Sequence, residues 1–310
     1  VAFTPRTTDR AFPLSLNTGR YRDQWHTMTR TGLSPKLSQH RREPLVDVAP
    51  GTARRYDLID GGLAEIRTAS GKSVFRVALT DNQRPFELFV PIHWTDQTSG
   101  AGRAGHLPAQ DRDPVSGQPG FKNTPASIRP IKPEWQGFLI TQNFETIPDC
   151  LYWTKVKTAA GWLVELAGMG DPDAMRALLP AGQPAEVRDT RRGVLRAVAL
   201  TQGRIEAALF IARDNSLPSR DWLISQLAAP EASTMELLAG RPAVPLPERG
   251  PIVCVCFDIG LKTIIAAIAD QSLTSVEAVG TAISAGTNCG SCRPAIAKLL
   301  PSAAALAKAR

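Results

Sequence analysis

Four cysteines near the end of the 310-residue chain constrain its fold more than any other feature. Cys254 and Cys256 form a C-x-C motif, and after 32 intervening residues Cys289 and Cys292 form a C-x-x-C motif. Four thiolates in two close pairs suit an iron–sulfur cluster or a structural zinc ion. Disulfides fit less well, because pairs so close in sequence bridge only with strain and five cysteines are few for a secreted scaffold. We therefore expect a small metal-bearing domain.

The composition describes a protein with real apolar cores, since 43% of its residues are hydrophobic. No apolar run reaches the roughly 18 residues that a transmembrane helix needs, and the first residues lack the apolar stretch of a signal peptide. These features predict a cytoplasmic protein with no membrane partner. The first residue is Val1 rather than Met, which predicts a fragment or a truncated gene product.

The net charge of +7 is concentrated near the start of the chain. Residues 1–55 contain ten Lys or Arg and four Asp or Glu, a net +6. Such a segment favours an anionic partner, which by charge alone is a nucleic acid, a phosphate ester or a small oxyanion.

Three regions follow one another along the chain. Residues 1–135 hold short β-like runs separated by turn formers, which indicates a β-barrel or sandwich. Residues 136–245 are mixed, and a Pro-rich linker leads to a helical region over 252–310. We thus expect a multi-domain protein.

Local patterns predict several elements. Two alternating runs, 194–200 and 205–211, flank Gln202-Gly203 and predict a hairpin. Short helices are expected over 171–179 and 220–227. The polar stretch 95–123 has little periodicity, which is typical of a functional loop, and we expect it to cover a ligand.

The cysteine region has its own helix signals. Asp258 is expected to cap a helix that ends near Asp270, and Thr274 with Glu277 has the spacing of a capping box for the next helix. Pro294 fits the first turn of a third helix. One cysteine pair would then precede a helix and the other would open one, where the helix N-terminus favours thiolates.

A second motif lies near the start of the chain, where an apolar run ends in Thr18-Gly19-Arg20. A glycine here would let a ligand approach the backbone, and the flanking Thr and Arg can hold a phosphate. The polar segment that follows offers many further donors. Its candidate ligand residues are Asp23, Gln24, Trp25, His26 and Thr27.

The cysteine segment resembles the bacterioferritin-associated ferredoxin-like [2Fe-2S] domain. The similarity includes the C-x-C and C-x-x-C spacing and the Gly-Thr-x-Cys-Gly-x-Cys loop. It implies a small helical domain in which Cys254, Cys256, Cys289 and Cys292 ligate a [2Fe-2S] cluster.

The Thr-Gly-Arg segment, with Trp25-His26-Thr27, resembles the dinucleotide-binding domain of the molybdopterin oxidoreductases. Further similarities are the Pro-x-His-Trp pattern that contains His93, and the Asp-Pro-x-Ser-Gly-Gln-Pro pattern that precedes Lys122. The resemblance implies a double-psi β-barrel over 1–135 that binds molybdopterin guanine dinucleotide, with His93 and Lys122 near the cofactor. One departure is Gly105, which stands where the family usually has an Asn that contacts the cofactor.

Together the two segments resemble the C-terminal part of bacterial assimilatory nitrate reductase catalytic subunits. This implies a chain that holds the molybdenum cofactor and passes electrons through [2Fe-2S] for the reduction of nitrate to nitrite. It also implies an electron-donor protein or flavin reductase subunit as partner. The [4Fe-4S] cluster and the catalytic residues are expected in upstream domains of the same enzyme, so no catalytic residue is named and the chain is expected to be inactive alone.

Two alternatives remain open at this point. One alternative is a formate dehydrogenase-like enzyme, because the barrel also resembles that of other molybdopterin oxidoreductases. A non-catalytic electron-carrier module is the other. Nucleic-acid binding, which the charge alone would permit, is not expected. The fifth cysteine, Cys150, has no matching context and is predicted to be a buried apolar residue.

Overall fold

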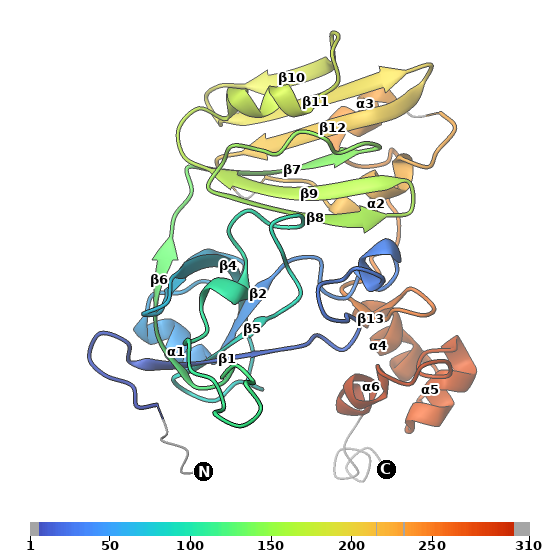
Figure 1. Cartoon of the computed structure of the whole chain (residues 1–310). Helices are drawn as coiled ribbons and strands as arrows, with labels where there is room; N and C mark the ends of the chain where they lie inside the picture. Colours follow the sequence, from blue (N-terminus) through green and yellow to red (C-terminus); the bar gives the residue numbers. More distant parts are fainter. Residues whose placement is uncertain (1–5, 215, 232, 301–310) are drawn as a thin grey trace. The chain divides into compact units, whose positions relative to one another are not determined.

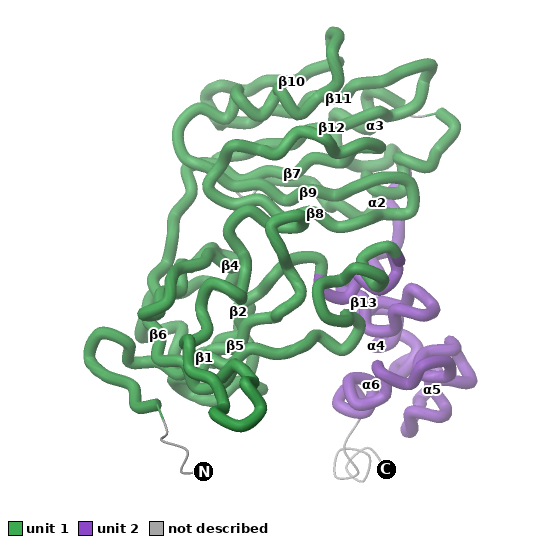
Figure 2. Tube along the Cα trace, viewed as in Figure 1, with its two compact units in different colours: residues 1–33, 42–243 green, residues 34–41, 244–310 purple. Residues whose placement is uncertain are grey.

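The computed structural model describes residues 6–214, 216–231 and 233–300, coloured along the chain in Figure 1. It divides into two compact units, drawn green and purple in Figure 2. The first comprises residues 1–33 and 42–243, and the second comprises 34–41 and 244–310. The outermost residues of the predicted first and last domains, 1–5 and 301–310, lie outside the described residues. The domain boundaries at 135 and 245 stay a prediction.

Six strands of the first unit close into a barrel, as the turn-rich first region predicted. Going round it, the strands are β1 (Leu14–Gly19), β5 (Glu87–Pro91), β2 (Leu45–Val48), β4 (Lys72–Leu79), β3 (Leu63–Arg67) and β6 (Thr124–Ile131). The pairs β1–β5 and β2–β4 are parallel and the other neighbours are antiparallel. One short helix, α1 (Pro50–Arg55), follows β2.

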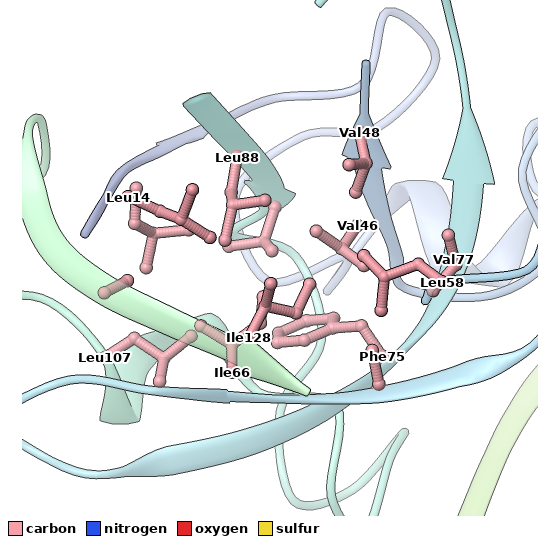
Figure 3. Close-up of a cluster of buried hydrophobic side chains, with 14 of the residues drawn as sticks. Leu14, Val46, Val48, Leu58, Ile66, Phe75, Val77, Leu88, Leu107 and Ile128 are labelled. Carbon is pink, nitrogen blue, oxygen red and sulfur yellow. The ribbon is translucent and has the colours of Figure 1, made fainter. Parts of the chain in front are cut away.

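The barrel interior is a separate apolar core. Alternate residues of β1 are buried, as a strand with one face inside a barrel requires. Phe75 lies among aliphatic side chains from several strands (Figure 3). None of the candidate ligand residues belongs to this core. The apolar packing inside the barrel is therefore made by other residues.

A six-stranded sheet makes up the rest of the first unit. Its order is β10 (Ala185–Asp189), β11 (Val194–Thr201), β12 (Arg204–Ala212), β7 (Trp135–Thr141), β9 (Gly161–Gly168) and β8 (Tyr152–Thr158). The predicted hairpin is β11–β12, and its turn residues Gln202 and Gly203 both have positive φ, 51° and 78°.

Both faces of this sheet are covered. Leu223 of α2 (Arg220–Gln226) and Leu237 of α3 (Thr234–Ala239) pack on one face. Met175 of the 3₁₀ segment η3 (Pro172–Leu178) packs on the other. The helices predicted near 171 and 220 are thus present, although the first is a 3₁₀ helix capped by Asp171.

Buried charges join the barrel and the sheet within this unit. The Arg76 guanidinium of β4 donates to both Glu43 oxygens (3.0 and 2.8 Å) and to Gln136 Oε1 of β7 (3.0 Å). Tyr152 of β8 is fully buried and its hydroxyl donates to Glu43 Oε2 at 3.0 Å. Burial opposes the charge on Arg76, but Glu43 outweighs it and the pKa of Arg76 lies above its ordinary value.

The described part of the second unit, which ends at residue 300, contains a two-stranded sheet and three helices. They are β13 (Ile252–Cys254), β14 (Ile259–Gly260), α4 (Leu261–Asp270), α5 (Val276–Ile283) and α6 (Arg293–Leu299). None of the helices in the described part of the chain is long and apolar enough to cross a membrane.

Two helix starts differ from the sequence prediction. Asp258 does not cap α4, because it has a left-handed φ of 55° and pairs with Arg249, while Gly260 occupies the N-cap position. Ser275, one residue after the expected Thr274, caps α5 by accepting from the Ala278 amide at 3.0 Å. Pro294 lies in the first turn of α6, as predicted.

Candidate functional site

The Thr-Gly-Arg motif lies at the end of β1, on the wall of the barrel. Thr18 is buried, and its amide and hydroxyl both donate to Phe121 O, at 3.3 and 3.1 Å. Lys122, in the segment before β6, donates to Thr18 O. The structure therefore brings together two segments that are about 100 residues apart in sequence.

Gly19 has a different reason for being glycine than the sequence suggested. A Cβ added there would lie 2.7 Å from Phe89 Cε2, so the missing side chain makes room for the Phe89 ring. Its carbonyl accepts from the Ile92 amide at 2.9 Å, which extends the β1–β5 pairing beyond the strand end. Close packing of protein on protein accounts for this glycine.

The loop that follows presents an exposed cluster of donors. The Arg20 guanidinium stacks over the Trp25 ring at 4.5 Å, and the His26 ring meets Trp25 edge-on at 4.6 Å. Trp25 is 56% exposed, although a large aromatic ring is usually covered. A cation beside an exposed flat ring is suited to a ligand that has both a phosphate and an aromatic base.

The remaining loop residues mostly hold the loop itself. Gln24 is buried, and its Oε1 accepts from the Thr31 hydroxyl at 2.6 Å. The Asp23 carboxylate is only 7% exposed and pairs with Arg22 at 2.9 Å. Thr27 is exposed and exchanges a hydrogen bond with Thr29 at 3.1 Å. Of these predicted ligand residues, Thr27 is the one whose side chain faces solvent.

The loop backbone is strained. His26 and Met28 both have left-handed φ values, 44° and 60°. Such conformations cost roughly 1–3 kcal/mol each in residues other than glycine and persist only where the surroundings enforce them. A small apolar cluster made by Tyr21, Met28 and Trp94, with Phe89 packed against it, lies beneath the loop.

His93 is the most buried of the predicted ligand residues, at 0% exposure. Its Nε2 accepts from the Tyr21 amide at 2.8 Å, and its Nδ1 lies 2.6 Å from His26 O. Burial lowers the pKa of His93. The hydrogen bond to His26 O opposes this effect, but the nearby Arg20 and His26 lower the pKa further, so the net shift is downward. His93 is thus placed beside the loop, with both ring nitrogens used within the protein.

Sequence reasoning missed Tyr21 and Trp94. Tyr21 packs edge-on against Trp94 at 5.7 Å, and its hydroxyl accepts from the Leu45 amide at 3.1 Å. Tyr21 directly follows the Thr-Gly-Arg motif, and Trp94 is the last residue of the Pro-x-His-Trp pattern, but neither was assigned a role. The available signal was an aromatic residue at or beside a motif. That signal does not predict which side chains such a residue contacts.

The polar stretch 95–123 is irregular apart from a 3₁₀ turn, η2 (Ala104–His106), and two isolated bridges. Its Asp-Pro-Val-Ser-Gly segment folds on itself: Asp113 Oδ1 accepts from the amides of Val115 (3.1 Å) and Ser116 (2.7 Å). These backbone bonds lower the pKa of Asp113. The segment is a preformed turn just before Lys122. Its role as a ligand cover stays a prediction.

The four predicted cluster ligands gather in the second unit. Cys254 and Cys292 are each 2% exposed and belong to one apolar core, while Cys256 packs against that core. Cys289 is exposed, and its sulfur lies 3.3 Å from the Cys256 sulfur. None of these four cysteines forms a disulfide.

Backbone conformation explains why the second cysteine pair reaches the first. Gly286 and Gly290 have left-handed φ values of 86° and 74°, which turn the loop around the sulfurs. Cys292 then begins α6, and its carbonyl accepts from the Ile296 amide at 3.0 Å. Ser291 Oγ lies 3.2 Å from the Cys289 sulfur.

Among the residues that the structure describes, no group of three or more histidine, cysteine or acidic side chains is arranged as a metal site. The all-sulfur donor set nevertheless suits iron–sulfur, since thiolates are its usual ligands.

Cys150 is separate from this group. It lies before β8, packs against the core of the six-stranded sheet, and its sulfur lies 3.2 Å from Tyr152 O. Burial raises the pKa of the Cys150 thiol to about 11. It is therefore a neutral thiol packed against apolar side chains, but only partly buried, whereas the sequence predicted a buried residue.

Comparison with known families assigns both segments. Residues 14–125 match the molybdopterin dinucleotide binding domain, and residues 252–302 match the BFD-like [2Fe-2S] binding domain. A nitrate reductase of Klebsiella oxytoca is 38% identical over 99% of this chain and 36% of its own length. The chain is a nitrate reductase homologue. It carries domains for molybdopterin dinucleotide and for [2Fe-2S], which confirms these two cofactor predictions.

Two further relatives match this nitrate reductase homologue over shorter stretches. An assimilatory nitrate reductase catalytic subunit of Bacillus subtilis is 33% identical over 39% of this chain and 16% of its own length. A formate dehydrogenase subunit alpha of Methanocaldococcus jannaschii is 25% identical over 28% of this chain and 13% of its own length. The chain thus spans about a third, or less, of the length of these relatives.

Proposed function

We propose that this chain forms the part of a molybdenum nitrate reductase that holds the dinucleotide end of the cofactor and carries a [2Fe-2S] cluster. When bound, the molybdenum cofactor supplies oxygen-atom chemistry for conversion of nitrate to nitrite, and the cluster supplies one-electron transfer. The observation that carries the proposal is the presence of both domains in one chain that aligns along 99% of its length with a nitrate reductase.

Within the barrel, we assign the dinucleotide site to the end of β1 and the loop after it. Arg20 and Lys122 would hold the pyrophosphate, because both are exposed cations at this strand end. The exposed Trp25 ring, with His26 and Thr27, would meet the guanosine. The other predicted residues would support the site without contacting the ligand. Four of them bond to protein through their side chains, namely Thr18, Asp23, Gln24 and His93, and at Gly19 the Phe89 ring fills the space.

In the second unit, we assign Cys254, Cys256, Cys289 and Cys292 as the cluster ligands. Cys254 and Cys292 would hold the buried side, and Cys256 and Cys289 the side nearer solvent. An electron-donor protein or flavin reductase subunit would then approach the Cys256–Cys289 side. Nitrate would reach molybdenum within the other domains of the enzyme. We assign no acid or base for that reaction to the residues of this chain.

The proposal is tested by metal analysis and electron paramagnetic resonance on the purified, reduced chain. We expect two irons per chain and a [2Fe-2S] signal that Cys289→Ser abolishes. Stoichiometric zinc without iron would overturn the assignment. Guanosine diphosphate, the nucleotide part of the cofactor, should bind to the same preparation, and Lys122→Met should weaken that binding.

A formate dehydrogenase-like enzyme is the second candidate, because a formate dehydrogenase subunit also matches part of this chain. That match covers 28% of the chain, against 99% for the Klebsiella nitrate reductase. Assay of the chain together with its upstream domains would separate the two candidates, with viologen-dependent nitrate reduction expected and formate oxidation absent. If the chain with those domains did neither, an electron-carrier role would remain.

A further inference from the structure

His93 lies two residues beyond the end of β5, in the only Pro-Ile-His-Trp sequence of the chain. It is completely buried, so its ring nitrogens do not contact solvent. Each ring nitrogen is instead committed to the backbone of the loop that carries Arg20, Trp25 and His26. A buried imidazole with two backbone partners acts on the loop rather than on a ligand.

The two hydrogen bonds determine the protonation of the ring. A backbone amide can only donate, so His93 Nε2, 2.8 Å from Tyr21 N, must be an unprotonated acceptor. A carbonyl can only accept, so Nδ1, 2.6 Å from His26 O, must carry the hydrogen. His93 is therefore a neutral imidazole in its Nδ1–H form.

The two bonded residues bracket the exposed donors. Tyr21 directly follows Arg20, and His26 directly follows Trp25. His26 has the left-handed φ of 44°, a costly conformation for a residue other than glycine that persists where the surroundings enforce it. The imidazole thus ties both ends of the segment 21–26 to β5, whose residues pair with β1 in the barrel.

We propose that His93 is a positioning residue that fixes Arg20, Trp25 and His26 in the geometry required for the guanine dinucleotide, without contacting it. The inference rests on the dinucleotide site proposed above and refines it. His93 is thereby assigned to the support of the site rather than to its ligand contacts.

The same geometry makes the support dependent on pH. A protonated ring would turn Nε2 into a donor facing the Tyr21 amide, which is also a donor. Burial disfavours this proton, and so do the nearby Arg20 and His26 side chains. The Tyr21 ring also faces His93, with 6.0 Å between the two ring centroids. Because the pKa of His93 is lowered from its ordinary 6.5, the folded protein binds the proton more weakly than the unfolded chain. The support is then intact above about pH 6.5 and is lost as the pH falls through the lower folded pKa.

Hydrogen exchange of the Tyr21 amide tests the support directly, in the full chain and without cofactor. We expect His93→Leu, which keeps the bulk and removes both bonds, to exchange this amide about tenfold faster or more. His93→Gln, which can offer an acceptor to Tyr21, should recover part of the protection. The Val77 amide, bonded to Gly62 O at 2.8 Å elsewhere in the barrel, is the control for folding and should not change.

Calorimetric binding of guanosine diphosphate tests positioning. His93→Leu should weaken binding about tenfold at neutral pH and His93→Gln less. In the wild type, binding should weaken on acidification, whereas in His93→Leu this component should be absent. Nitrogen-15 chemical shifts should identify the Nδ1–H form above pH 6.5.

Three results would overturn the inference. One is unchanged Tyr21 exchange in His93→Leu, and another is faster exchange with unchanged nucleotide affinity. The third is failure of the wild type to bind guanosine diphosphate. That last result would remove the proposed dinucleotide site as well, and the exchange data would still report whether His93 holds the loop, so the two failures are distinguishable.

Discussion

The barrel and the cysteine unit carry their candidate sites in opposite ways. In the barrel, the site lies on a loop outside the apolar core, and hydrogen bonds from His93 and Thr31 shape it. In the cysteine unit, Cys254 and Cys292 are two of the seven buried members of the core itself. In the barrel, exposed site residues such as Lys122 can therefore be changed without touching the apolar core, whereas a change of Cys254 or Cys292 alters site and core together.

The largest effect is expected where site and core coincide. Cys292→Ser should abolish iron binding and also destabilise the iron-free second unit, because it puts a hydroxyl into an apolar core. Cys289→Ser should abolish iron binding alone, since Cys289 is exposed. Iron content and thermal unfolding of the apo protein measure the two effects.

Cys150→Ala is the matched control for both variants. Its thiol packs against the core of the six-stranded sheet, apart from the other four cysteines, so this variant should keep two irons per chain. Loss of iron from it, or equal unfolding of the apo forms of Cys289→Ser and Cys292→Ser, would contradict the comparison.

A large effect on stability without loss of iron is expected from the buried charges of the first unit. Arg76→Met would leave the Glu43 carboxylate without its cationic partner. Breaking a buried ion pair on one side costs about 3–5 kcal/mol. Denaturant unfolding followed by fluorescence should report this fall, while [2Fe-2S] absorbance persists. A change below about 1 kcal/mol, the range of surface pairs, would show that the pair is solvated.

A smaller, purely functional effect is expected at the barrel site. Lys122→Met should weaken guanosine diphosphate binding about tenfold, because it removes one charge-assisted phosphate contact. The unfolding midpoint should hardly move, since Lys122 is exposed. Lys132→Met, another exposed lysine of the barrel sequence, is the matched control and should bind as the wild type does. Equal affinity in both variants would separate Lys122 from the dinucleotide.

The smallest effect concerns reactivity rather than stability. Because burial raises the pKa of Cys150 to about 11, its thiolate is scarce near pH 8. Alkylation of the iron-free protein with iodoacetamide at pH 8, followed by mass spectrometry, should label the exposed Cys289 well before Cys150. Labelling of Cys150 should increase only as the pH approaches 11. Early labelling of Cys150 would show that it is not packed as described.

Much of the fold was predictable where the signal is local. The Gln202-Gly203 turn between alternating runs predicted the β11–β12 hairpin, because two-residue turns impose the pairing of their flanks. Pro294 predicted the start of α6 for a similarly local reason. The start of α4 was wrong because Asp258 is drawn into a pair with Arg249, nine residues earlier, instead of capping the helix.

The candidate site was predictable in its residues but less so in their roles. Thr18, Arg20 and Trp25 were identified from a motif, and the structure gathers them at one strand end. Gly19 was expected to admit a ligand, yet Phe89 occupies the space in front of it. Asp23 and Gln24 were expected to face a ligand, yet both are turned into hydrogen bonds within the loop.

The sequence by itself determined the chemistry of this protein: four thiols in two close pairs, a Thr-Gly-Arg strand end, and a basic first segment. These follow from residue types at short spacing, which chain geometry converts directly into proximity. Only the tertiary structure decided that His93 supports the loop, that Phe89 fills the space at Gly19, and that residues 34–41 belong to the cysteine unit. The reason is physical: each depends on contacts between residues tens to hundreds of positions apart, which barrel closure and core packing select and local pattern does not encode.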